Sequence, residues 1–500
     1  MVVGIDVGGT NTDAAIIGED GIITVKMPSE LGIASVLREL RRRTDLAAEK
    51  VVVSTSIPLN FVLSRFDEVK TLTILIPGPG LNYGSYGRVV RGYVNHRGDV
   101  VEEIDEEEVE RILREESYDN LAVAAKFSVR NSQLEEKVKE IALKYVGEDR
   151  IALSHFAGGM SYPARINTTV VNAKIKATVH ELTELVRSYA GDFYYYTGDG
   201  GITPYSVALE NPSVLYNSSP AAVAMGAYFL TSEENAVVVD IGGTTTDIVF
   251  IENGSPRIVE GLELYGRKTL IRCVDAISVP FGGDSYVNGR LNPKKLDKPI
   301  AFGGKFFTLT DALNCLGHEI GNYRASREAG KNQDCESVVD AFVSQLGGIL
   351  SSFEVEKIIG AGYLAPYLVP DIAERCGAKY VIPKHFECVN AIGVAVSRLS
   401  LRLYARFDTE KCVASYNGIV EECPFRRGSL PSEEEVVEVA KEKLREFAKN
   451  FGADESDFGE ARIIYLSGFV VVRGGIRRGA VYDVVVQFEP GLRYDTGRFS

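Results

Sequence analysis

Residues 236–251 read AVVVDIGGTTTDIVFI, and residues 2–17 read VVGIDVGGTNTDAAII. The two stretches align without a gap, so that Asp6 corresponds to Asp240 and Asp13 to Asp247. Each copy is an apolar run, a polar turn with two glycines and a second apolar run, which predicts a β-hairpin. Because the same pattern occurs twice, the sequence indicates a structure built on two related hairpins.

The turns of these hairpins have the composition of a phosphate-binding site. Glycine has no Cβ, so backbone N–H groups can approach an anion closely, and threonine hydroxyls add hydrogen-bond donors without adding charge. A carboxylate would repel a phosphate, so Asp6 and Asp240 predict a divalent cation between them, which we expect to be Mg²⁺. For either copy alone, an ordinary hairpin turn is the alternative. The predicted phosphate-binding residues are Gly8, Gly9, Thr10, Asn11, Thr12, Gly242, Gly243, Thr244 and Thr245.

Two such hairpins facing each other across a cleft are typical of the actin-like ATPase superfamily, which the chain resembles. The resemblance implies ATP as a cofactor and a third glycine turn that contacts the adenosine. Residues 355–367, VEKIIGAGYLAPY, match that turn with Gly360 and Gly362, in the expected order along the chain. We therefore expect an α/β fold with two actin-like (ribonuclease H-like) ATPase domains around a nucleotide cleft.

The segments between these elements resemble the hydantoinase A/5-oxoprolinase family, which also includes ATP-dependent ketone carboxylase subunits. The resemblance covers about residues 1–400. Two departures leave the substrate open: Ala164 stands where the family usually has an acidic residue, and the proline-rich Gly-Pro segment that normally follows the second domain's glycine loop is missing. The matching motifs are Ser154-His155, Arg165, TTVVNA at 168–173, GDGG at 198–201, SPAA at 219–222, TLTDAL at 308–313 and VNAIG at 389–393.

The family resemblance implies an ATP-dependent hydrolase that opens a cyclic amide or imide, such as a hydantoin or 5-oxoproline, after phosphorylating its carbonyl oxygen. Two other classes stay open: a small-molecule kinase with the same phosphate site, and a regulatory ATPase subunit that needs a partner. The family also implies a separate large subunit of the hydantoinase B type. A homo-oligomer is compatible with all of these alternatives.

Five residues are candidates for catalysis. Asp13 and Asp247 could act as a general base or as outer-sphere contacts of the metal, or they could brace the hairpin turns by accepting backbone N–H bonds. Asp199, in its glycine-rich turn, has the same two interpretations. His155 and Arg165 could bind a carboxylate or carbonyl of the substrate, although a single histidine at a strand end is more often structural.

The composition excludes several classes of function. The chain has 500 residues, a formal net charge of −14 and no long basic run, so we expect no binding to nucleic acid. No apolar run is long enough to span a bilayer, and the first strand begins at residue 2, so we expect a soluble cytoplasmic protein without membrane contact. The seven cysteines form no Cys-x-x-Cys motif and are expected to be free thiols.

Hydrophobic periodicity predicts alternating strands and helices over most of the chain. From about residue 408 the pattern changes to a charged helix with a capping box at Ser432 and Glu435, followed by valine-rich strands near 462–473 and 479–488. We therefore divide the chain into an N-terminal actin-like domain at 1–167, a second at 168–407 and a small α+β appendage at 408–500. The predicted strands lie at 51–56, 71–76, 121–127, 151–154 and 193–197, and the predicted helices include 33–43, 133–145, 168–189 and 390–406.

Overall fold

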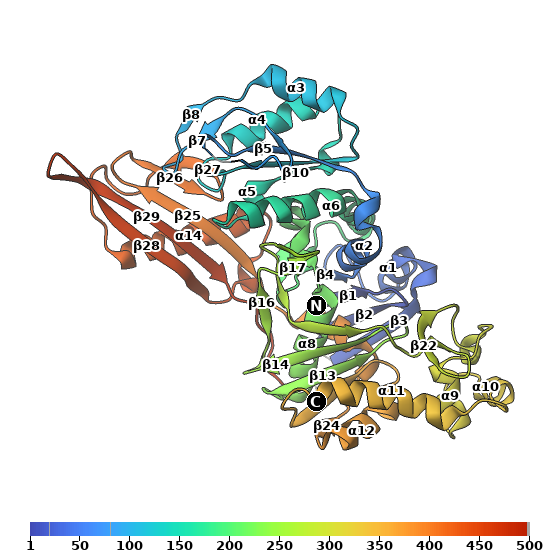
Figure 1. Ribbon diagram of the computed structural model, residues 1–500. Helices are drawn as coiled ribbons and strands as arrows, with labels where there is room; N and C mark the ends of the chain where they lie inside the picture. The colour runs from blue at the N-terminus through green and yellow to red at the C-terminus, as the bar shows by residue number, and fades with distance from the viewer. Residues whose placement is uncertain (20, 81, 498–500) are drawn as a thin grey trace.

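The computed structural model describes residues 1–19, 21–80 and 82–497 (Figure 1). Its first sheet is built on the predicted N-terminal hairpin, in which β1 (Val2–Val7) pairs antiparallel with β2 (Asn11–Gly18). Four strands complete this sheet: β3 (Gly21–Pro28), β4 (Lys50–Thr55), β11 (Tyr194–Tyr196) and β12 (Ile202–Pro204). The strand order is β12-β11-β4-β1-β2-β3, with β4 parallel to β1.

The second sheet repeats this plan around the second hairpin. β13 (Ala236–Ile241) pairs antiparallel with β14 (Thr246–Glu252), and β23 (Lys357–Ala361) runs parallel to β13. β15 (Ser255–Pro256), β20 (Ala276–Val279) and β24 (Lys379–Val381) complete the sheet. The repeated arrangement confirms the predicted hairpins and the predicted α/β fold with two actin-like domains.

Two helices lie between the sheets and pack on both of them. These are α8 (Ser218–Thr231) and α13 (Val389–Val396), whose small apolar side chains join strand residues of both sheets in one core. The helices approach so closely that a Cβ on Gly393 would lie 1.9 Å from the Ala222 carbonyl oxygen, and one on Gly226 would lie 2.1 Å from the Val389 oxygen. Glycine is required at both positions because the backbones themselves are in contact.

Helices cover the outer faces of both sheets. The first sheet packs against α1 (Ile33–Arg41) and the long α6 (Tyr162–Ala190). The second sheet packs against α9 (Leu309–Cys315), α11 (Cys335–Leu350) and α12 (Ala365–Cys376). With both faces covered, the central strands are apolar on both sides, which explains the long hydrophobic runs in the sequence.

A separate layer is inserted between β4 and α6, at the top of Figure 1. Its parallel sheet contains β10 (Ile151–Leu153), β9 (Asn120–Ala125), β5 (Thr71–Ile76) and β6 (Arg88–Val89), in that order. α3 (Glu106–Glu115) and α4 (Gln133–Ala142) contribute to its core. The predicted strands at 71–76, 121–127 and 151–154 are thereby confirmed, with small differences at their ends.

The C-terminal unit is an antiparallel sheet with one helix against it. The strand order is β27 (Ile419–Glu422), β26 (Val413–Tyr416), β25 (Leu401–Asp408), β29 (Ile476–Phe488) and β28 (Ala461–Arg473). α14 (Glu433–Asn450) begins with the predicted capping box of Ser432 and Glu435. In Figure 1 the hairpin of β28 and β29 extends away from the rest of the molecule.

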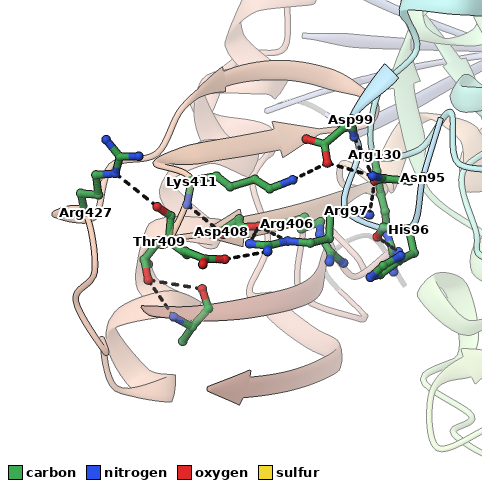
Figure 2. A network of polar contacts seen from close by, with 12 residues as sticks. Asn95, His96, Arg97, Asp99, Arg130, Arg406, Asp408, Thr409, Lys411 and Arg427 are labelled. Carbon is green, nitrogen blue, oxygen red and sulfur yellow. Dashed lines mark hydrogen bonds and ion pairs between the residues drawn. The ribbon is translucent and has the colours of Figure 1, made fainter. Parts of the chain in front are cut away.

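Ion pairs join the C-terminal sheet to the inserted layer, as Figure 2 shows. Arg97, which follows β7 (Tyr93–Val94), donates to Asp408 and, at 2.6 Å, to Glu410. Lys411 pairs with Asp99 in the same loop. Arg97 is largely buried, with 13% of its side chain exposed, so loss of its acidic partners would leave a buried charge unpaired.

The remaining elements are short and connect the sheets. They are α2 (Ile57–Arg65), β8 (Val100–Glu102), α5 (Ser154–Ala157), α7 (Tyr205–Glu210), β16 (Ile258–Glu260), β17 (Glu263–Leu264), β18 (Arg267–Lys268), β19 (Arg272–Val274), β21 (Ser285–Val287), β22 (Leu291–Lys295) and α10 (Tyr323–Ala329).

The predicted helix over 390–406 was wrong in its second half. α13 ends at Val396, and residues 401–408 form β25, which is held by β29 and β26 on its two sides. Strand pairing also leads us to propose domain limits other than 167 and 407. β11 and β12 belong to the first sheet although they follow residue 167, and β25 belongs to the C-terminal sheet although all of it except Asp408 precedes residue 408. Within the described residues, no helix combines the length and apolar character needed to cross a bilayer.

Substituting Gly393→Ala tests the contact of α8 with α13. The added methyl group would meet the Ala222 carbonyl oxygen, so the two helices must separate, and we expect the free energy of unfolding to fall by about 2 kcal/mol. The matched control is Gly348→Ala on α11, where no atom lies within 4 Å of the added Cβ; a gain of about 0.5–1 kcal/mol is expected there. Denaturant unfolding measures the free energy of unfolding of both variants. Equal changes in the two variants would contradict the proposed close packing of α8 and α13.

Candidate active site

The turns of the two hairpins face each other directly. The Thr10 hydroxyl lies 3.1 Å from the Thr244 hydroxyl, although the two residues belong to different sheets. Each turn is closed in the same way, with the Gly8 N–H donating to the Asn11 carbonyl at 3.1 Å and the Gly242 N–H donating to the Thr245 carbonyl at 3.0 Å. A Cβ on Gly243 would lie 3.0 Å from the Thr10 hydroxyl, so glycine allows this close approach.

The two predicted metal ligands lie where the hairpin strands meet α8 and α13. The Asn390 side-chain amide is 3.2 Å from Asp6 Oδ2 and 3.4 Å from Asp240 Oδ2, so it connects the two carboxylates. Ser219, at the start of α8, donates to Asp6 Oδ2 at 2.9 Å. The other oxygen of Asp6, Oδ1, is buried without a hydrogen-bond partner.

Burial makes the charged forms of these carboxylates costly. It raises the pKa of Asp6, and burial together with the nearby Asp247 raises the pKa of Asp240 to about 7. A divalent cation would restore the charged forms, and the free Asp6 Oδ1 is a suitable oxygen ligand. Among the described residues, no three His, Cys, Asp or Glu side chains gather into a metal site, so any cation here needs water or phosphate oxygens as well. Mg²⁺ fits this donor set, because it retains water and is usually bound by one or two carboxylates.

Asp13 and Asp247 occupy equivalent places on the second strands of the hairpins. Asp13 pairs with Asp6 across β1 and β2, and Asp247 pairs with Asp240 across β13 and β14. Asp13 also accepts from Lys26 at 2.9 Å, and its pKa is raised to about 6 because burial outweighs this ion pair. Burial likewise raises the pKa of Asp247. Thr12, next to Asp13, is buried, whereas Thr10 and Asn11 are partly exposed at the turn.

Only one glycine of the third turn faces the carboxylates. Gly362 has a positive φ of 84°, and a Cβ there would lie 2.8 Å from Asp240 Oδ1. Gly360 lies within β23, where a Cβ would meet Ile382, Val369 and Ala365 in the core. Gly360 therefore allows α12 to pack closely on the strand, and Gly362 brings the turn against the Asp240 carboxylate.

Several residues at this site had no predicted role. Lys295, at the end of β22, has its ammonium group 2.8 Å from Asp284 Oδ2 and 3.3 Å from the Thr10 hydroxyl. No local pattern distinguished it, because it lies in a turn-rich segment with other lysines. Asn390 and Ser219 lie in the motifs VNAIG and SPAA, which resemble the family. Membership in these motifs was the sequence feature that could have indicated a role for them.

Asp199 lies in a different environment. It accepts hydrogen bonds from Thr197 at 2.6 Å and from Ser400 at 2.7 Å, and it pairs with Arg272. These groups border a cavity of about 140 Å³ that is lined by both actin-like domains and the C-terminal unit. None of the predicted hairpin residues lines this cavity.

His155 and Arg165 belong to a buried network under the inserted layer. His155 Nδ1 is 2.8 Å from Glu135, whose pKa is lowered because hydrogen bonds from His155, Ser154 and a backbone N–H outweigh its burial. Arg165 is fully buried and donates to Ser154 and to the backbone carbonyls of Gly159, Ala125 and Lys126. This network holds α5 and α6 against β9, and the structure does not bring it to the hairpin turns.

Comparisons with known proteins agree with the fold and the hairpins. A model of the hydantoinase/oxoprolinase N-terminal region matches residues 2–146, and a hydantoinase/oxoprolinase model matches residues 165–352. An uncharacterized protein of Methanocaldococcus jannaschii is 27% identical over 328 residues, which are 61% of this chain and 45% of that protein. The caprolactamase subunit alpha of Pseudomonas jessenii is 22% identical over 366 residues, or 62% and 52% of the two chains. The chain thus spans about half the length of these curated relatives.

A solved structure shares nearly the whole fold. The nucleotide-free acetone carboxylase structure superposes with a TM-score of 0.71 over 98% of this chain and 87% of that chain, at 17% sequence identity. At this level of identity the similarity concerns the fold alone, and it supports the arrangement of two actin-like domains with a C-terminal unit.

The raised pKa of Asp240 predicts how pH affects the metal-free protein. A carboxyl group whose pKa is higher in the folded than in the unfolded state stabilises the fold below pH 4, and this contribution is lost as pH rises to about 7. Asp240→Asn removes the buried charge, so in EDTA the variant should melt at a higher temperature than the parent at pH 8, and the difference should shrink toward pH 4. A variant that is equally destabilised at both pH values would contradict this account.

Proposed function

Because the chain belongs to the hydantoinase/oxoprolinase family, we propose that it is an ATP-dependent hydrolase that acts on a cyclic amide or imide of the hydantoin or 5-oxoproline type. The observation that carries this proposal is the pair of facing hairpin turns, with Thr10 opposite Thr244 and with Asn390 between Asp6 and Asp240. Such a pair can hold a triphosphate from two sides and a cation beneath it.

The proposed role of each residue follows from its position in the site. The partly exposed Thr10 and Asn11 would donate to the terminal phosphates from one side, and Gly243, Thr244 and Thr245 from the other. Asp6 and Asp240 would hold Mg²⁺, which when bound neutralises phosphate charge. Lys295 adds a positive charge beside Thr10, which favours the negative charge of the phosphoryl group in transfer.

The proposed reaction has two parts. In the first, the carbonyl oxygen of the ring forms a bond with the γ-phosphorus of ATP while the bond to ADP breaks. In the second, water adds to the activated carbon and the carbon–nitrogen bond breaks with a proton passing to nitrogen, which leaves an acyl phosphate. A second water then adds to this carbonyl carbon and the bond to phosphate breaks, which yields the ring-opened acid and phosphate beside the ADP of the first part. Asp247 is the better candidate to accept a proton, because Asp13 already pairs with Lys26.

The comparisons supply support for this substrate class and for a partner. The matched Pseudomonas jessenii protein is named as the alpha subunit of a caprolactamase, which supports a cyclic amide as the substrate class and a second subunit as a partner in this proposal. We therefore include a large subunit of the hydantoinase B type in the proposal, together with a cytoplasmic location. The cavity beside Asp199 is a candidate substrate site, since three parts of the chain meet there.

ADP release by the purified chain with Mg²⁺ and ATP tests the proposed activity. The panel is 5-oxoproline, hydantoin, N-methylhydantoin and simple ketones with bicarbonate, with and without a co-expressed large subunit. Stimulation by a cyclic amide together with a ring-opened product supports the proposal. A stable phosphorylated product would identify a kinase instead, and slow turnover that no compound changes would indicate a regulatory ATPase.

Lys295→Met tests the role of the lysine that sequence analysis missed. Loss of its charge beside the phosphates should lower ATP turnover by about 10²-fold. Lys294→Met is the matched control, since its side chain is exposed and adjacent in the sequence; its turnover should stay within about twofold of the parent. Equal ATP turnover in the two variants would show that Lys295 has no role in phosphoryl transfer.

A further inference from the structure

The outer edge of the C-terminal sheet is long and apolar. β28 pairs with β29 on one side, and no described strand pairs with its other side. Residues 463–472 read IIYLSGFVVV and carry no charge. Natural edge strands are usually short or carry charges or proline, because an open apolar edge recruits other strands. Large apolar side chains at least 43% exposed on this hairpin are Ile463, Ile464, Tyr465, Phe469, Val470, Val472 and Ile476.

The position of this edge leaves it accessible. The hairpin of β28 and β29 projects from the body of the molecule in Figure 1, and the exposed residues of β28 follow one another, so side chains on both of its faces reach solvent. A patch of this kind is uncommon on a monomer and marks a contact with another chain.

The sequence pattern of β28 is suited to pairing with β28 of a second copy of the chain. Ser467 is the middle residue of β28, and large apolar residues at equal distances from it match one another: Tyr465 with Phe469, Ile464 with Val470 and Ile463 with Val471. The pairing with β29 is regular from Tyr465 to Val471 and is interrupted at both ends of that stretch. A strand related to its copy by a two-fold axis must match its own reversed sequence, and this strand does so in size and polarity.

We propose that β28 pairs antiparallel with β28 of a second copy about a two-fold axis at Ser467, which joins the two five-stranded sheets into one. In this register Tyr465 lies opposite Phe469 of the second copy, and Ile464 lies opposite Val470. Aromatic and β-branched cross-strand pairs of this kind stabilise a sheet.

The charges at the ends of the strand favour this register. With the axis at Ser467, Arg462 faces Val472 and Arg473 faces Ala461 of the second copy. No two charged residues of β28 are then directly opposite each other, whereas like charges in that position would destabilise a strand pair. The inference does not depend on the proposed activity.

The mass of the full chain in solution tests the proposal. Sedimentation or light scattering should give a dimer of about twice the 54.6 kDa chain mass, and Phe469→Lys should shift it to the monomer. Tyr380→Lys is the matched control, because Tyr380 lies on another edge strand, β24, and is 49% exposed compared with 54% for Phe469. The control should remain a dimer. A monomeric parent chain, or a dimer that Phe469→Lys leaves intact, would overturn the proposal.

A cross-link fixes the register and does not need the lysine variant to fold. The two Ser467 residues would face each other at a Cα separation of about 4.5–5.5 Å, so Ser467→Cys should form a covalent dimer under mild oxidation. Ile476→Cys, exposed at the far end of the hairpin, should not. Equal cross-linking of both variants, or cross-linking of neither, would contradict the two-fold pairing. Capture of a different protein by a monomeric chain would assign the edge to that protein instead.

Discussion

The hydrogen bonds of Asn390 connect the two halves of the molecule. Its side-chain amide reaches Asp6 from the first hairpin and Asp240 from the second, so one residue contacts both of the carboxylates proposed to hold the metal. Asn390 can do this because α13 passes between the sheets in backbone contact with α8, at Gly393 and Gly226. A Cβ on Gly4 would lie 2.2 Å from the Ala391 oxygen, so β1 is equally close to the same helix. The position of the carboxylates thus depends on the absence of side chains at these glycines.

This arrangement of buried carboxylates has an energetic cost. Asp6, Asp13, Asp240 and Asp247 all have raised pKa values, with burial as the main cause in each case. Such a group of carboxylates destabilises the protein at neutral pH, and a cation held by Asp6 and Asp240 would recover part of that free energy. Strained or unfavourable electrostatics of this kind are typical of functional sites, where the surrounding fold holds the groups in place.

Much of the fold could be predicted because it depends on local pattern. The apolar runs and glycine turns gave both hairpins, and the ungapped alignment of the two copies correctly placed Asp13 and Asp247 in equivalent positions. Long-range contacts could not be predicted. Lys295 reaches Thr10 from 285 positions away in a turn-rich segment, and helical periodicity continued past Val396 although α13 ends there. A histidine and an arginine in a motif suggested substrate binding, but in the structure His155 and Arg165 are buried and hold helices to a strand.

Calorimetric titration with ATP, with and without Mg²⁺, most directly tests the claim that one asparagine organises a nucleotide site from both hairpins. The account predicts that ATP binds tightly only when Mg²⁺ is present, and that Asn390→Leu weakens this binding by about 10–100-fold because the two carboxylates lose their common donor. ATP binding that is the same without Mg²⁺ and in the Asn390→Leu variant would contradict it.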